Sequence, residues 1–281
     1  MVACWGFNKR NLQTIMRKLL LKFLLFVFLL FSVWFLLSKI DWMTIFRVEQ
    51  ATQNMEEKVG DLFWKYLKKS ENEIIADSII APVDSLLSRI CTKNKIERTG
   101  IKFHLVRKDE INAFAFPNNH LVLYSGLING CENEAELCGV LSHEIAHMEK
   151  RHIMNKLIKD FGLSVLISMS AGNGNSEMIK AAIRHLSSTA YDRNLEIEAD
   201  LTAVEYLINA NIDPEPFANF LYRLSDKDVN SSAQLQWIST HPDSKERGEK
   251  IIETIKNRTI TKTPIIGEQS WNLLIKRLKE I

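Results

Sequence analysis

Two histidines and a glutamate lie within little more than one turn of a predicted helix, in the segment LSHEIAHMEKRH of residues 141–152. His143 and His147 are four residues apart, so their imidazoles project from the same helix face. Two imidazoles with this spacing can chelate one zinc ion. Glu144 lies beside that face, where a carboxylate can take a proton from an activated water molecule. The spacing predicts a zinc site with a general base, and the alternative is a polar helix face rich in histidine.

A catalytic zinc ion needs a third protein ligand and an open fourth position. The segment EIEAD provides Glu196 as the candidate on a separate predicted helix, with Asp200 one turn later. Asp200 can accept the spare N–H of one ligand histidine and so fix its tautomer. The alternative for these acids is a solvated helix face, which is our interpretation of Glu198 and Glu205.

The hydrophobic pattern predicts the elements that position these residues. Apolar residues recur at three and four from Asn133 into the 150s, which predicts the helix that carries the histidines. Before it, alternation with a period of two predicts three short strands in a small antiparallel sheet, at residues 101–107, 111–116 and 120–125. Further helices are expected at residues 48–69, 74–90, 157–169, 177–188, 191–210, 215–224, 244–257 and 269–279. The fold class is therefore α+β and mainly helical.

An apolar run of 22 residues, Leu19–Ile40, follows a basic N-terminus. As a helix it would be about 33 Å long, enough to cross a bilayer core of about 30 Å. The rival interpretation is a cleaved signal peptide, but no small-x-small cleavage site follows the run. We expect one transmembrane anchor that contacts the lipid bilayer, with the N-terminus in the cytoplasm and the rest outside. In a bacterium with two membranes, that location is the periplasm.

Charge and cysteine content argue against a nucleic-acid-binding protein, a cysteine metal site and a disulfide-rich scaffold. Residues 1–40 hold six basic residues and no acid, so the remaining chain has 30 basic against 34 acidic residues. This balance gives no electrostatic reason to expect nucleic-acid binding. The four cysteines form neither a metal-binding spacing nor a disulfide framework, and we expect small buried residues. They are Cys4, Cys91, Cys131 and Cys138.

Several motifs together carry a resemblance to a known family. LSHEIAHMEKRH followed by YDRNLEIEAD, with INAFAFPNNHLVLYSGLI before them and NIDPEPF and STHPDSKERGEKI after them, resembles the gluzincin metallopeptidase family M48. Its branches include HtpX, the CAAX prenyl endopeptidases and the BepA-like periplasmic proteases. The resemblance covers residues 72–257 and implies a zincin-like domain with one zinc ion and endopeptidase activity. It implies the ligands His143, His147 and Glu196, the base Glu144 and a supporting Asp200.

The resemblance also assigns roles outside the metal motif. His241, in THP, matches a histidine close to the zinc in the BepA-like branch, where it would cap the fourth position or stabilise the oxyanion. Without the resemblance, it would be an ordinary loop residue. Arg193 matches a family arginine with a structural or substrate-facing role. A single anchor, rather than several spans, is expected to separate the chain from HtpX and the prenyl endopeptidases. The expected lack of a tetratricopeptide tail separates it from the other members of the BepA-like branch. The expected division is a basic cytoplasmic segment 1–18, an anchor 19–40, a helical linker 41–71, a protease domain 72–257 and a helical tail 258–281.

The other histidines have weaker signals. On a continuous helix His152 would lie about 140° round from His147, so we expect it to be structural or at the surface. We expect His104, His120 and His185 to be surface or strand residues.

The leading functional hypothesis is hydrolysis of peptide bonds in misfolded or unassembled envelope proteins. An extended polypeptide substrate would add to an exposed strand edge, either residues 112–116 or residues 120–124, through main-chain hydrogen bonds. The expected contacts are Asn112, Ala113, Phe114 and Ala115. One alternative is a chaperone or assembly factor that binds extended segments at the membrane and has only latent proteolysis. Another is a structural zinc domain, which predicts a closed site with four ligands.

Overall fold

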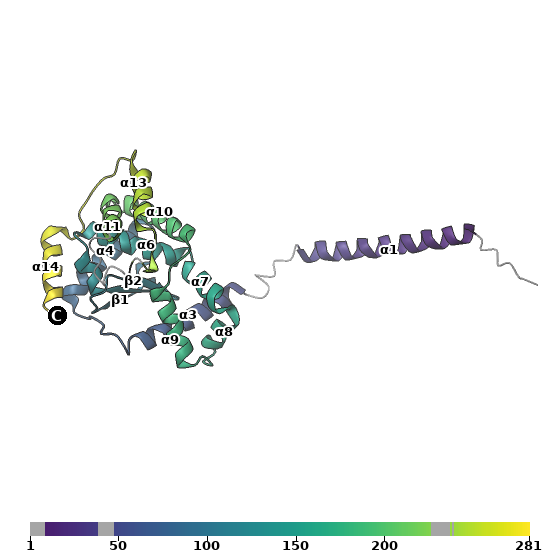
Figure 1. The fold of residues 1–281 in the computed structure, drawn as a ribbon, viewed down its shortest axis with the longest axis horizontal. Helices are drawn as coiled ribbons and strands as arrows, with labels where there is room; N and C mark the ends of the chain where they lie inside the picture. Colours follow the sequence, from purple (N-terminus) through teal and green to yellow (C-terminus); the bar gives the residue numbers. More distant parts are fainter. Residues whose placement is uncertain (1–8, 39–47, 226–236, 238) are drawn as a thin grey trace, which may run out of the picture. The chain divides into compact units, whose positions relative to one another are not determined.

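The computed structural model describes residues 9–38, 48–225, 237 and 239–281 of the 281-residue chain. The chain divides into two compact units, residues 1–53 and residues 54–281. In the second unit, helices surround one small sheet (Figure 1). This confirms the α+β, mainly helical class predicted from the sequence.

Helix α1, Lys9–Ser38, lies in the first unit. Its side chains are described from Lys18 to Ser32, and the large apolar ones from Leu19 to Phe31 are exposed. Residues 39 and 40 of the expected anchor lie outside the described residues. Within the described part of the chain, no helix combines the length and the hydrophobicity needed to cross a bilayer.

The sheet contains three strands, β1 (Lys102–Val106), β2 (Ala113–Phe116) and β3 (His120–Tyr124), in the order β1-β3-β2. β2 and β3 form the expected antiparallel hairpin. β1 pairs with β3 in parallel, so the prediction of an all-antiparallel sheet was wrong. An alternating pattern identifies strands but not the direction of their neighbours. Residues 112–116 and residues 120–124 were the two strand edges expected to receive a substrate. Because β3 is the central strand, both of its edges are paired, and only β2 keeps a free edge among these two.

The hairpin turn packs directly against α3 (Val48–Leu67). Asn118 and Asn119 have φ angles of 63° and 55°, a left-handed conformation that asparagine tolerates better than most residues. Gly60 of α3 faces the turn, and a Cβ atom there would lie 2.0 Å from the Pro117 carbonyl oxygen. The glycine therefore permits the close approach of helix and turn.

The remaining helices include the predicted ones in their predicted order, together with α5 (Ser125–Gly130), which was not predicted. They are α4 (Asp77–Lys93), α5 (Ser125–Gly130), α6 (Glu134–Glu149), α7 (His152–Phe161), α8 (Leu163–Ser170), α9 (Ser176–Ser188), α10 (Arg193–Asn209), α11 (Glu215–Ser225), α13 (Ser244–Ile255) and α14 (Gly267–Lys279), with a short 3-10 helix at Arg98–Gly100. The single helix expected over residues 157–169 was wrong, because Gly162, with a φ of 84°, separates α7 from α8.

Helix α6 lies in the interior and contacts α10, α11, α4 and β2. Its N-terminus is capped by Asn133, whose side-chain oxygen accepts hydrogen bonds from the backbone N–H groups of Ala135 and Glu136 at 3.1 Å. Gly139 lets α11 approach, because a Cβ atom there would lie 2.4 Å from the side chain of Phe217. The predicted ligand histidines on this helix are consequently buried rather than displayed on a surface.

Segments on both sides of the predicted protease domain contribute to its core. Val59 and Phe63 of α3 are fully buried, and α14 packs against α4 with Trp271 and Leu274 buried. The Glu134 carboxylate accepts backbone N–H groups of residues 265–267 at 2.7–3.1 Å, which fastens the start of α14. Three cysteines are free and buried, as predicted, at positions 91, 131 and 138. Cys4 lies outside the described residues.

Candidate active site

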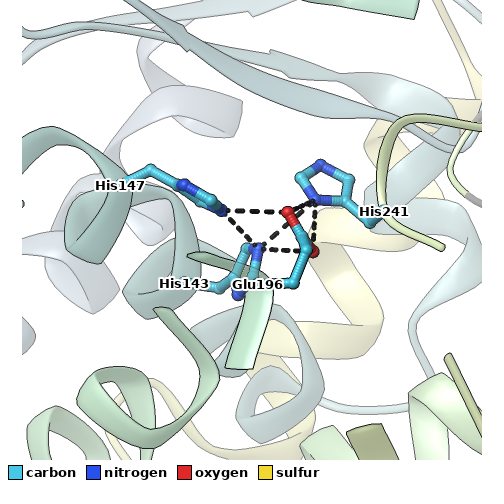
Figure 2. A group of neighbouring side chains, drawn as sticks. All are labelled: His143, His147, Glu196 and His241. Atoms are coloured by element: carbon cyan, nitrogen blue, oxygen red, sulfur yellow. Dashed lines mark hydrogen bonds and ion pairs between the residues drawn. The ribbon is translucent and has the colours of Figure 1, made fainter. Parts of the chain in front are cut away.

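Four buried side chains converge where α6, α10 and the segment before α13 meet (Figure 2). They are His143 and His147 from α6, Glu196 from the first turn of α10, and His241. Each offers one ligand atom, and these atoms all lie within 4.8 Å of one another. The structure therefore brings together all three predicted ligands and the histidine whose role was left open.

The spacing of these atoms fits one metal ion. Nε2 of His143 lies 3.0 Å from Nε2 of His147 and 3.3 Å from Nδ1 of His241. The nearest Glu196 oxygens lie 3.3 Å from His147 Nε2, 3.6 Å from His143 Nε2 and 3.1 Å from His241 Nδ1. Four ligands about 2.0–2.1 Å from a tetrahedral zinc ion would be about 3.3 Å apart. Three imidazoles and a carboxylate at these distances fit zinc.

The nitrogen of His143 that points away from this cluster is held by Asp200, as its predicted role requires. His143 Nδ1 lies 2.9 Å from Asp200 Oδ1. Asp200 does not reach His147. That contact belongs to His152, whose Nδ1 lies 2.9 Å from His147 Nδ1 and whose Nε2 lies 3.5 Å from Glu198.

The burial of His152 corrects the surface alternative, since its side chain is only 3 % exposed. The 140° estimate assumed that one helix continues through residue 152. Instead α6 ends at Glu149, and Arg151 takes a left-handed φ of 57° before α7 begins. This turn brings His152 back against His147.

Arg247 of α13 is an unpredicted member of the site. Its side chain is buried and donates from Nε and Nη2 to the two Asp200 oxygens at 2.6 and 2.7 Å. Its Nη1 lies 2.6 Å from a Glu196 oxygen. In the sequence it belongs to a charged helix, SKERGEKI, where nothing distinguishes it from its solvated neighbours.

Burial and charge set the protonation of the carboxylates. Burial raises the pKa of Glu144 well above its ordinary value, and Glu196 raises it further, which outweighs the lowering by Arg247 and the Ala115 backbone N–H. Burial also opposes ionisation of Glu196, but Arg247 and His241 hold its pKa well below the ordinary value. Glu196 is therefore an anionic ligand, whereas Glu144 retains a proton readily once it has accepted one.

Burial lowers the pKa of His143 to about 3, against the opposing effect of Asp200. The imidazole is consequently neutral at physiological pH, which is the form that binds a metal ion. His241 Nε2 lies 3.5 Å from a Glu144 oxygen, so this histidine touches both the ligand set and the predicted base.

Two aromatic rings close the site, and neither was predicted. The ring of Tyr191 stacks on His147 with 4.2 Å between centroids, and the ring of Trp237 stacks on His241 at the same separation. Both side chains are buried. Single aromatic residues outside any motif carry no signal in one sequence, so only the packing identifies them.

The predicted substrate contacts lie beside this centre. The Ala115 backbone N–H lowers the pKa of Glu144, which indicates that the outer edge of β2 (residues 113–116) faces the predicted base. The Asn112 side chain donates to the Ser187 carbonyl oxygen at 3.3 Å. The Ala113 and Phe114 side chains are buried.

Arg193 lies away from the ligands. Its side chain is 55 % exposed, forms an ion pair with Glu246 and lies 3.9 Å from Asp243. With Arg247 and Lys250 it lines a cavity of about 340 Å³ between α10 and α13.

Comparison with known proteins identifies the family. The profile of peptidase family M48 matches residues 81–255. The β-barrel assembly-enhancing protease of Yersinia pestis is 27% identical over 201 residues, which are 67% of this chain and 41% of that protein. Its namesake in Escherichia coli (strain K12) is 25% identical over 239 residues, 80% of this chain and 48% of that protein. The mitochondrial metalloendopeptidase OMA1 of Schizosaccharomyces pombe is 25% identical over 202 residues, 71% and 60% of the two chains. The chain spans about half the length of the curated relatives it matches.

Proposed function

The chain belongs to peptidase family M48, and from this membership we propose that it is a zinc-dependent endopeptidase. The observation that carries the proposal is the convergence of four ligand atoms next to a buried glutamate whose pKa is raised. Imidazole nitrogens with one carboxylate are a donor set that suits zinc.

In this proposal His143, His147 and Glu196 hold the ion. When bound, zinc would polarise the scissile carbonyl and make the attacking water more acidic. Glu144 takes the proton from that water and passes it to the leaving nitrogen. Its raised pKa suits the second transfer, because a weakly acidic carboxyl keeps the proton until the amine forms.

His241 occupies the fourth ligand position, and we interpret this arrangement as a capped resting form. A closed set of four ligands is also what a structural zinc site would show, so that reading is the second candidate. The position of Glu144 favours the enzyme. A structural site has no use for a buried carboxyl group 3.5 Å from one of its ligands.

The proposed substrate is an extended polypeptide that pairs with the outer edge of β2. The Ala115 N–H beside Glu144 supports this, because a strand added there would pass the base. The substrate would pair mainly with the backbone of Asn112, Ala113, Phe114 and Ala115. Such main-chain pairing tolerates many substrate sequences. Arg193 lines the cavity between α10 and α13, so it would contact only a part of the substrate that lies away from the metal ligands. Two relatives are named for enhancing β-barrel assembly. By analogy we propose misfolded or unassembled envelope proteins as substrates.

We also propose that residues 19–40 anchor the chain in a membrane, with the catalytic unit in the periplasm. Basic residues before the run and exposed apolar side chains from Leu19 to Phe31 support this orientation. A chaperone or assembly factor that binds extended segments is the alternative function, and the same strand edge would serve it.

The decisive experiment compares the 281-residue chain with its Glu144→Gln variant in detergent, using unfolded casein and zinc analysis. The expected result is one zinc ion per chain in both proteins and hydrolysis only by the wild type. Equal hydrolysis would reject the protease, and equal suppression of casein aggregation without hydrolysis would favour the chaperone.

A further inference from the structure

Peptide hydrolysis needs a hydrogen-bond donor for the oxyanion that develops on the substrate carbonyl. His241, which the family resemblance offered for this task, is engaged elsewhere, and so is Arg193, for which a structural or substrate-facing role was expected. Arg193 is paired with acidic residues at the cavity between α10 and α13. His241 contacts Glu196 and His143 through Nδ1 and lies against Glu144 through Nε2.

Tyr191, two residues before α10, lies directly against the ligand cluster. Its ring stacks on His147 with 4.2 Å between centroids and an angle of 28°. Its centroid is 6.3 Å from that of His241, with an angle of 25° between the rings. The residue is 9 % exposed. No described residue forms a hydrogen bond with the Tyr191 phenol oxygen.

The stacked ring places the Tyr191 phenol beside the ligand cluster. Burial raises the pKa of Tyr191 well above its ordinary value, and the carboxylates of Glu144 and Glu196 raise it further, so the hydroxyl keeps its proton. A phenol O–H beside the cluster can donate a hydrogen bond to a substrate oxygen that enters the site.

Lys156 of α7 holds the same ring. Its Nζ lies 4.2 Å from the Tyr191 ring centroid and donates to the Thr189 carbonyl oxygen. The residue is 7 % exposed, and within the described residues no carboxylate forms an ion pair with it. Burial lowers the pKa of Lys156 to about 8. A buried ammonium group with these partners fixes the ring by a cation–π interaction and strengthens the phenol as a donor.

We propose that Tyr191 is a catalytic residue whose hydroxyl donates a hydrogen bond to the oxyanion of the scissile carbonyl, and that Lys156 is its positioning residue. This proposal rests on the proposed peptidase function. It assigns to the side chain beside His147 the task that neither Arg193 nor His241 is free to perform.

The test uses Tyr191→Phe in the 281-residue chain and a fluorogenic peptide. Phenylalanine keeps the stack on His147, so zinc affinity and thermal stability should stay at the wild-type level. The value of kcat should fall about 100-fold to 1,000-fold with little change in KM. Tyr206→Phe, which removes a half-buried phenol further along α10, is the matched control and should have full activity. Wild-type kcat in Tyr191→Phe would overturn the proposal.

A binding measurement tests the same contact without turnover. A phosphonamidate peptide carries a tetrahedral anion that mimics the oxyanion, and Tyr191→Phe should weaken its affinity by a factor similar to the loss in kcat. Unchanged affinity would contradict the role. Glu144→Gln, measured in parallel, separates the hypotheses. If it hydrolyses as fast as the wild type, the peptidase assignment fails. If it is inactive while Tyr191→Phe is fully active, only the role of Tyr191 fails.

The positioning role predicts a difference between two Lys156 variants. Lys156→Met removes the charge and should lower kcat by about tenfold, whereas Lys156→Arg keeps a cation over the ring and should restore most of the activity. Equal losses of kcat in both variants would show that the packing of the lysine side chain matters and that its charge does not.

Discussion

The side chains of Arg247 and Asp200 form a buried ion pair with two hydrogen bonds, of 2.6 and 2.7 Å. The same aspartate lies 2.9 Å from His143, and the same arginine reaches Glu196 at 2.6 Å. One side chain of α13 therefore supports ligands on both α6 and α10. Its charge also keeps both carboxylates ionised, because the pKa values of Glu196 and Asp200 lie below their ordinary values despite burial.

Replacing Arg247 by Met should lower the free energy of unfolding by about 3–5 kcal/mol, because two buried carboxylates lose their counter-ion. Urea denaturation of the metal-free protein measures the loss. Arg258→Met, which breaks an exposed pair with Glu205, should cost less than about 1 kcal/mol. An Arg247 variant as stable as the control would show that the buried pair contributes nothing.

Asp200→Asn should weaken zinc binding by about 10-fold to 100-fold while the fold is retained. The amide is a poorer acceptor for the His143 N–H than the carboxylate, so the ligand becomes less basic. Competition with a chromophoric chelator gives the affinity. Glu205→Gln further along α10 is the matched control, since its side chain is 49 % exposed and pairs with Arg258 rather than with a ligand or its support. Equal affinities in the two variants would refute the supporting role.

His241→Ala should retain zinc, with lower affinity, and should hydrolyse peptides faster than the wild type. Three ligands remain, and the vacated position becomes open to water and substrate. Zinc content and turnover of a fluorogenic peptide measure the two effects. Complete loss of the metal would instead make His241 an essential ligand of a closed structural site, and lower activity with full zinc would favour oxyanion stabilisation.

The sequence predicted the residues whose spacing is local and left out those that the tertiary fold supplies. His143 and His147 were visible because one helical turn relates them. Arg247 and Tyr191 were not, since a helix of mixed charge and a lone aromatic residue show no periodic signal. The position of His152 depended on one left-handed residue, Arg151, that a helical projection cannot anticipate. Likewise, alternation predicted the strands but not the parallel pairing of β1 with β3.

Acid should destabilise the catalytic unit through His120, far from the metal ligands in sequence. This buried histidine lies 3.0 Å from Asp61 and 2.9 Å from His104. Burial lowers its pKa to about 4, below the value of about 6.5 for an unfolded chain. The unfolded state therefore binds the proton more tightly, and stability present above pH 6.5 is lost as the pH falls towards 4. The loss should approach about 3 kcal/mol.

Urea denaturation between pH 7 and pH 4.5 tests this prediction on the metal-free protein. Groups that do not contact His120 titrate in the wild type and in His120→Asn alike, so the difference between the two reports on His120 with its partners Asp61 and His104. The variant should be less stable at pH 7 and should lose less stability on acidification. Parallel pH profiles would mean that His120 keeps an ordinary pKa in the folded protein.

Gly139→Ala should raise helix propensity but should also create a steric clash, and these two effects on stability have opposite signs. On a solvent-exposed helix face the change would stabilise the protein by about 1 kcal/mol. Here the added Cβ atom would lie 2.4 Å from the Phe217 side chain, so α6 and α11 must separate. Overpacking of this kind costs about 1–3 kcal/mol, so we expect a net loss of stability.

The same displacement should reach the metal site, because Gly139 precedes His143 by four residues and shares its helix face. Zinc affinity should therefore fall together with stability, and Phe217→Leu in the Gly139→Ala background should recover part of both by giving the methyl group room. Gly100→Ala is the matched control, since its Cβ atom would lie 3.9 Å from the nearest side chain. Thermal denaturation and zinc titration of the four proteins decide the case. If Gly139→Ala is more stable than the wild type, helix propensity outweighs the contact with Phe217, and the position of His143 does not depend on that contact.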